Sequence, residues 1–282
     1  MEWRPRSRAA GGRAALALLL GLLFGMPSPV LGAAPAYPWL RAQEGHGNLA
    51  ERIPAPPGFE RPPAASGSIA AWLRGLPLRP AGSRVQLFDG RERSSQAGVF
   101  AVLDVDVGRR DLQQCADAVL RLRAEYLYAQ GWHARIVFHF TSGDAARWTA
   151  WRAGWRPVVS GNRVEWRQQA AADSSYVTFR AYLDAVFMYA GSYSLARELE
   201  PVADPSTVMP GDVFVQGGVP GHAVLVADVA VASQGERRFL LVQSYMPAQD
   251  LHVLVNPADP ATPWYPARRH GTLVTPDWHF SY

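Results

Sequence analysis

One cysteine and one histidine are the residues of this sequence best suited to nucleophilic chemistry. Cys115 is the single cysteine of the 282 residues. His222 follows a Pro-Gly turn and begins a run of small and branched residues, which places it at the rim of a predicted strand. A histidine at a strand end keeps one ring nitrogen free, so it can act as a base for a nucleophile on a neighbouring helix.

Gln243 supplies the third polar group that such a pair needs. A predicted hairpin turn at residues 233–234 places His222 opposite approximately Tyr245, with Gln243 close by. A side-chain oxygen there could hold the imidazole in one tautomer. We therefore predict Cys115, His222 and Gln243 as catalytic residues of a thiol hydrolase: the thiol attacks, the imidazole takes and returns the proton, and the amide orients the imidazole or contributes to the oxyanion site.

Each of these residues also has a purely structural interpretation. Cys115 lies on the apolar stripe of its predicted helix, about five residues from the start, which is typical of a buried and inert thiol. His222 could donate one hydrogen bond to a carbonyl and fill core space. Asp104 and Asp106, on one face of a predicted strand end, could act as paired carboxylates or face solvent or an arginine.

Composition excludes several classes of protein. The sequence has no lysine, because all 28 basic residues are arginine, which removes Schiff-base chemistry and the phosphate-loop lysine. A single cysteine allows no internal disulfide, thiolate zinc site or iron–sulfur cluster. We predict no cofactor and no metal, since the remaining histidines lack metal-binding spacing: His46, His133, His139, His252, His270 and His279.

Residues 1–36 have the pattern of a secretory signal peptide. Four arginines precede an uncharged stretch that is too short to span a bilayer, and a small-residue cleavage zone follows. Its removal lowers the net charge from +4 to +1, so the basic composition does not indicate nucleic-acid binding. We predict a periplasmic or secreted protein without a membrane span after cleavage. The oligomeric state stays open.

The elements that must position the three residues form an α+β pattern: helices first and meandering antiparallel strands afterwards. Helices are predicted at residues 69–76, 111–130 and 176–189. Strands are predicted as a loose hairpin of residues 84–88 and 97–107, then at 135–140, and then in the C-terminal half at 212–216, 222–231, 238–246 and 252–255.

The remaining segments carry weaker signals. A Pro-rich lead-in at residues 37–66 is predicted to be extended, a Trp-rich segment follows the strand at 135–140, and a C-terminal strap at 256–282 is predicted to be irregular. Residues 37–282 are expected to fold as one α+β domain, with helices packed on an antiparallel sheet.

Two family resemblances bear on this pattern. The Gly-Asp strand at residues 211–212 and the Gly-His strand start at 221–222 resemble the NlpC-type cell-wall peptidases, which are papain-like thiol hydrolases. More broadly, the segments 111–118, 121–128 and 243–249 look like an exported bacterial family known as domain of unknown function 4846, which implies no established activity. The NlpC resemblance implies a papain-like core with an N-terminal extension.

The resemblance to NlpC-type enzymes also implies a different nucleophile position. It aligns Asp173 and Ser174 with their Asp-Cys pair, so that Ser174 replaces the cysteine. A serine hydroxyl is a weaker nucleophile than a thiolate, which favours a binding protein on an enzyme's fold.

We therefore expect a cell-envelope protein that acts on, or binds, an amide of a peptidoglycan stem peptide or a similar polymer. The first alternative is a catalytically inactive binding or scaffolding module in which His222, Gln243 and Tyr245 serve recognition only. The second is a structural envelope protein without a small ligand.

Overall fold

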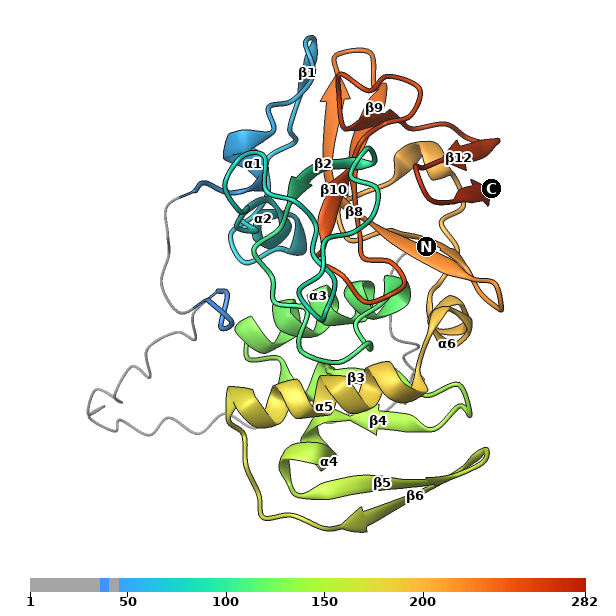
Figure 1. Ribbon diagram of the computed structural model, residues 1–282. Helices are drawn as coiled ribbons and strands as arrows, with labels where there is room; N and C mark the ends of the chain where they lie inside the picture. Colours follow the sequence, from blue (N-terminus) through green and yellow to red (C-terminus); the bar gives the residue numbers. More distant parts are fainter. Residues whose placement is uncertain (1–35, 41–45) are drawn as a thin grey trace, which may run out of the picture.

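The computed structural model describes residues 36–40 and 46–282 (Figure 1). The predicted signal peptide therefore lies outside the described residues, apart from Ala36. Among the described residues, no helix combines the length and the apolar character that crossing a membrane requires.

A seven-stranded antiparallel sheet forms the upper part of the molecule in Figure 1. Its main path runs β1-β8-β9-β10-β2, while β7 pairs with β8 and β11 pairs with β9. The bounds are β1 Phe59–Glu60, β2 Val99–Val102, β7 Val213–Gln216, β8 His222–Ala232, β9 Arg237–Gln243, β10 His252–Leu254 and β11 Trp264–Pro266.

The long strand β8 is buried on both faces, which its sequence requires. Ala223 and Leu225 belong to a core cluster on the helix side, whereas Val224 and Val226 belong to a second cluster on the other side. Side chains of a strand alternate between its faces, so an unbroken run of small and branched residues can fill both. His222, like Val224, points to the second side.

Helix α3 (Cys115–Ala129) packs against β8, and α5 (Tyr176–Tyr189) forms the next layer below it in Figure 1. Below α5 in Figure 1 lie α4 and the small hairpin β5–β6, while the hairpin β3–β4 lies at the level of α5 in this view. The other bounds are α1 Leu49–Arg52, α2 Ile69–Arg74, β3 Val137–His139, β4 Ala145–Arg147, α4 Trp148–Arg152, β5 Trp155–Ser160, β6 Arg163–Gln168, α6 Ser192–Glu198, β12 Thr272–Val274 and β13 His279–Ser281, with 3-10 turns at His133–Arg135 and Pro205–Thr207.

A buried ion network fixes α3 against α5. Arg121 and Glu125 are both fully buried and lie 2.6 Å apart, and Glu125 also accepts a hydrogen bond from Tyr176. Arg121 and Arg180 pair with Asp106, which shows that this carboxylate faces arginines. Asp104 likewise lies 3.9 Å from an arginine, so neither aspartate forms a paired-carboxylate site.

The α+β prediction is confirmed, and so are the helix at residues 176–189 and the four C-terminal strands, although β9 already ends at Gln243. The predicted hairpin of residues 84–88 with 97–107 is wrong. Residues 84–88 make only isolated bridges, and β2 pairs with β10, because a distant strand offers it a longer ladder than the Gly-containing loop does.

Three further segments contain helices and strands that were not predicted. The predicted lead-in, residues 37–66, contains α1 and β1, and the predicted strap, residues 256–282, contains β11 and the hairpin β12–β13. The Trp-rich segment forms α4 and the hairpin β5–β6.

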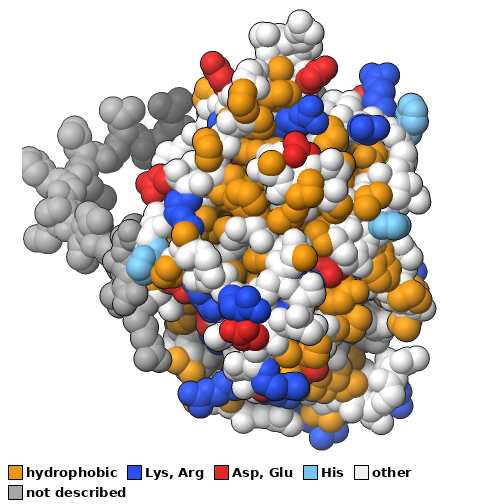
Figure 2. All heavy atoms as spheres, turned by 45° about the horizontal axis from the view of Figure 1, so that its top comes forward, with side chains coloured by type: hydrophobic (Ala, Val, Ile, Leu, Met, Phe, Trp, Pro, Cys, Tyr) orange, Lys and Arg blue, Asp and Glu red, His pale blue; other side chains and the backbone are white. Residues whose placement is uncertain are grey.

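On the face shown in Figure 2, arginines are interspersed with acidic and hydrophobic side chains.

Candidate functional site

Cys115 is the first residue of α3, which corrects the prediction that the helix begins at residue 111. Gln114 is extended and forms the N-cap, and its N–H donates to the carboxylate of Asp117 at 3.1 Å. This local capping ends the preceding turn and starts the helix at the cysteine. The thiol therefore lies among the free N–H groups of a helix N-terminus, where developing negative charge is favoured.

The start of α3 is tied to the chain that follows β9. The Ser244 hydroxyl lies 3.0 Å from the carbonyl of Gln113, and the N–H of Ala248 donates to Asp111 at 2.7 Å. These contacts hold the cysteine beside the end of β9, where Gln243 is the last residue.

His222 begins β8 and is 1 % exposed. The preceding Gly221 has no room for a side chain, because an added Cβ would lie 2.5 Å from the carbonyl oxygen of Gly218 and 2.8 Å from that of Gln216. The Gly-His sequence is therefore a packing requirement. The Gly-Asp sequence is also structural, since Gly211 has φ +99° and Asp212 accepts a hydrogen bond from the N–H of Met209 at 2.8 Å.

The imidazole of His222 is held by the side chain of Gln243. Its Nε2 lies 2.9 Å from Gln243 Oε1, and both side chains are buried. The amide Nε2 of Gln243 donates to Asp277 at 2.6 Å and lies 3.4 Å from His252 Nε2. With Nε2 of His222 engaged in this way, Nδ1 is the nitrogen that remains for acid–base work.

Ala223 links Cys115 to the start of β8, although its side chain and that of His222 point to opposite faces of the sheet. Its N–H interacts with the sulfur of Cys115, and it follows His222 directly in β8. Tyr245 lies next to His222, with 5.1 Å between the two ring centroids. Between Cys115 and His222, both of them described, the structure shows no hydrogen bond.

Burial acts on the two groups in opposite directions. It raises the pKa of the Cys115 thiol, and the N–H groups of Ala116 and Ala223 offset only part of this rise. Burial also lowers the pKa of His222, against the hydrogen bond that its Nε2 donates to Gln243 and the charge of Asp277. At neutral pH both the thiol and the imidazole are therefore neutral.

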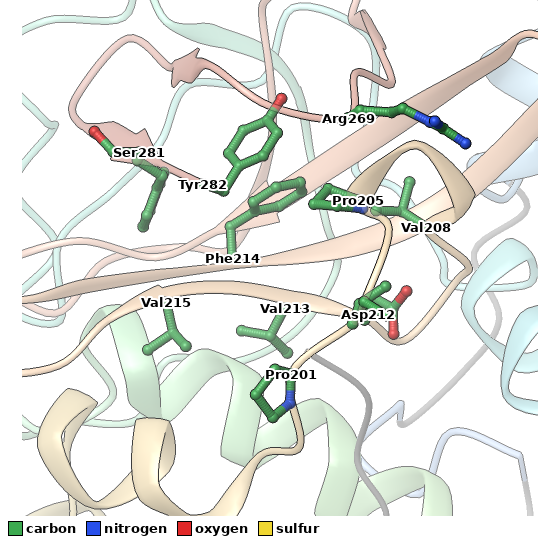
Figure 3. Close-up of a pocket in the computed structure, with 13 residues that line it drawn as sticks. Pro201, Pro205, Val208, Asp212, Val213, Phe214, Val215, Arg269, Ser281 and Tyr282 are labelled. Atoms are coloured by element: carbon green, nitrogen blue, oxygen red, sulfur yellow. The ribbon is translucent and has the colours of Figure 1, made fainter.

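Aromatic rings of the C-terminal segment enclose the imidazole on the side away from α3. The ring of Trp278 lies 5.4 Å from that of His222, and the ring of Phe280 lies 5.8 Å from it. Phe280 also lines a cavity of about 440 Å³ between β7, residues 201–208 and β13. Figure 3 shows Phe214 and Tyr282 side by side in this cavity, with Arg269 at its rim.

Ser174 is not brought to this site. It is exposed, and its carbonyl accepts a hydrogen bond from Tyr128, near the opposite end of α3. Thirteen residues of helix separate Tyr128 from Cys115, which corresponds to about 20 Å. The structure thus places Cys115, and not Ser174, near the start of β8, where its sulfur interacts with the N–H of Ala223.

Sequence reasoning missed Asp277 and His252 as part of the site. His252 is fully buried, and burial lowers its pKa to about 4. The two residues share no sequence motif. The pairing of β10 with β9 brings His252 to the site, and the path of the C-terminal strap brings Asp277 there. Among the described residues, no group of histidine, cysteine and acidic side chains could hold a metal ion.

A sequence model of the family described as "Domain of unknown function (4846)" matches residues 49–282. The chain belongs to this family. Neither the curated proteins nor the solved structures that were compared include a match. The family description names no activity, so the chemistry has to be argued from the site.

Proposed function

We propose that this member of the family is an exported thiol hydrolase with a papain-like, NlpC-like core, which cleaves an amide bond in a peptide or in a peptidoglycan stem peptide. The observation that carries the proposal is the combination of a thiol at a helix N-terminus with an imidazole whose Nε2 is held by an amide oxygen. A nucleophile, an adjacent base and a residue that orients the base are the minimum set for acyl transfer.

In the proposed reaction the sulfur of Cys115 attacks the carbonyl carbon of the amide. His222 Nδ1 takes the thiol proton as the carbon–sulfur bond forms, and it returns this proton to the leaving amine as the carbon–nitrogen bond breaks. Water then attacks the thioester carbonyl and gives its proton to the same nitrogen as the carbon–oxygen bond forms; the carbon–sulfur bond breaks and the proton returns to the sulfur, which releases the carboxylic acid and restores the thiol. N–H groups at the start of α3 are placed to stabilise the negative oxygen of each tetrahedral intermediate.

The neutral resting pair fits this order of events. A thiol with a raised pKa and an imidazole with a lowered pKa hold no ion pair before substrate arrives. Proton transfer then accompanies the attack, which is general base catalysis.

The test uses purified stem peptides and muropeptides, with mass spectrometry to detect new amine ends. We expect Cys115→Ala to abolish cleavage and His222→Ala to lower kcat by about 10²–10⁴. His279→Ala is the matched control, since this histidine is exposed on β13. If Cys115→Ala cleaves as fast as the parent protein, the thiol is not the nucleophile.

The burial of the thiol favours one second candidate, a catalytically inactive binding module. Cys115 is 9 % exposed and its pKa is raised, as expected for a thiol that only fills space. In that case the same glycan peptides bind, as calorimetry would show, but the parent protein yields no cleavage products and Cys115→Ala binds equally well. Reaction of the native thiol with iodoacetamide would then require denaturation.

A further inference from the structure

The side-chain amide of Gln243 must choose between two orientations that differ by exchanging its oxygen and nitrogen. Only one of them offers an acceptor to His222 Nε2 and so leaves Nδ1 of the ring unprotonated. The orientation of this amide decides which nitrogen of the imidazole is unprotonated and can accept a proton. The groups that contact the amide on the side away from His222 determine the orientation.

Asp277 lies on that far side and fixes the choice. Its carboxylate can only accept hydrogen bonds, and Gln243 Nε2 donates to Oδ2 at 2.6 Å. If the amide turned over, its oxygen would meet the carboxylate without a hydrogen between them. The orientation with Oε1 toward His222 is therefore the favoured one.

His252 acts in the same direction. Its Nδ1 lies 3.0 Å from the carbonyl oxygen of Asp250 and must carry the proton there, so Nε2 is an acceptor. This acceptor lies 3.4 Å from Gln243 Nε2. Both neighbours of the amide nitrogen thus accept, and the amide oxygen is left for His222.

Arg93 holds Asp277 in place from a separate segment of the chain. Its Nη2 lies 2.5 Å from Asp277 Oδ1, and the two side chains are only 12 % and 15 % exposed. Each carboxylate oxygen thus has its own donor, arginine on one side and Gln243 on the other. Trp278 follows Asp277 and its ring lies against His222, so the strap both orients the imidazole and covers it.

We propose that Asp277 of the C-terminal strap is a positioning residue of the site: it sets the orientation of Gln243 and thereby the tautomer of His222 that can accept the thiol proton. The inference deepens the proposed function and rests on it for its catalytic consequence. The effect on the tautomer does not depend on turnover.

The test replaces Asp277 by the isosteric asparagine. Arg93 then donates to the single side-chain oxygen of the new asparagine, so the NH₂ group of this asparagine faces Gln243. Gln243 turns over to accept from this NH₂ group with its own oxygen. We expect ¹⁵N NMR at pH 8 to show His222 protonated at Nε2 in the parent protein and at Nδ1 in Asp277→Asn, with the signal assigned by its loss in His222→Gln. We expect kcat to fall about 10–100-fold with KM little changed.

A second variant shows that the hydrogen-bond pattern, and not general damage, is responsible. In Asp277→Asn/Gln243→Glu the new carboxylate accepts from both the asparagine and His222 Nε2–H, so the parent tautomer returns. Asp259→Asn, in an exposed turn of the same strap, is the matched control. An unchanged tautomer in Asp277→Asn would overturn the inference. A changed tautomer in a protein that cleaves nothing would support the inference and refute the proposed hydrolase.

Discussion

Replacement of Gly221 by alanine tests whether the turn before His222 positions the base. The added Cβ would meet two backbone oxygens, those of Gly218 at 2.5 Å and Gln216 at 2.8 Å, and the Ser192 hydroxyl closer still. Overpacking usually costs about 1–3 kcal/mol, and backbone atoms cannot turn aside as a flexible side chain can. We therefore expect a loss of about 3 kcal/mol, which is roughly a 100-fold change in the unfolding equilibrium.

Urea unfolding followed by tryptophan fluorescence measures this loss. Gly191→Ala is the matched control, since it lies in the same region and meets nothing within 4 Å; as the N-cap of α6 it should cost no more than about 1 kcal/mol. Ser192→Ala combined with Gly221→Ala should recover only part of the stability, because both backbone contacts remain. If Gly221→Ala were as stable as Gly191→Ala, the packing explanation of the Gly-His sequence would be wrong.

Three further predictions concern charge. Because burial lowers the pKa of His222, the acid limb of kcat/KM should lie below pH 6.5; a midpoint at or above this value would contradict the assigned base. The pKa of His252 is lowered from 6.5 to about 4, so the unfolded state binds the extra proton first. About 3 kcal/mol of the free energy of unfolding depends on neutral His252; it is fully present above pH 6.5 and is lost as the pH falls toward 4. His252→Gln should therefore flatten the acid side of a stability–pH curve. Arg121→Met should cost about 3–5 kcal/mol in thermal unfolding by stranding buried Glu125, and Arg121→Met/Glu125→Leu should cost less than the single change.

The sheet and the main helices were predictable because their signals are local. The run that forms β8 and the turn near residues 233–234 specify a hairpin, and the structure pairs β8 with β9 as predicted. The register near His222 also depends on a bulge between Val226 and Asp228, which shifts the pairing by one residue. Gln243 was found beside His222 because this hairpin was predicted.

The start of α3 was not predictable from the apolar stripe alone. Leu112 has the right spacing to continue the helix, yet the cap formed by Gln114 and Asp117 starts the helix at Cys115. This difference of four residues changes the thiol from an interior residue to one at the helix N-terminus. Asp277 could not be found for a different reason: its contact with Gln243 joins residues 34 apart through an irregular segment.

In the proposed mechanism, the burial that makes the thiol unreactive also makes its activation depend on substrate. In a buried site an ion pair of thiolate and imidazolium loses its hydration, so the neutral pair of Cys115 and His222 is the lower state. Charge then appears only as the sulfur attacks, next to the helix N-terminus and the N–H of Ala223. Interactions that strengthen only as charge develops lower the barrier without stabilising the resting state, which is the requirement for a raised kcat. Slow alkylation of the native thiol together with fast cleavage of a bound amide is therefore the combination that this site predicts, whereas slow alkylation without cleavage would leave only the binding module.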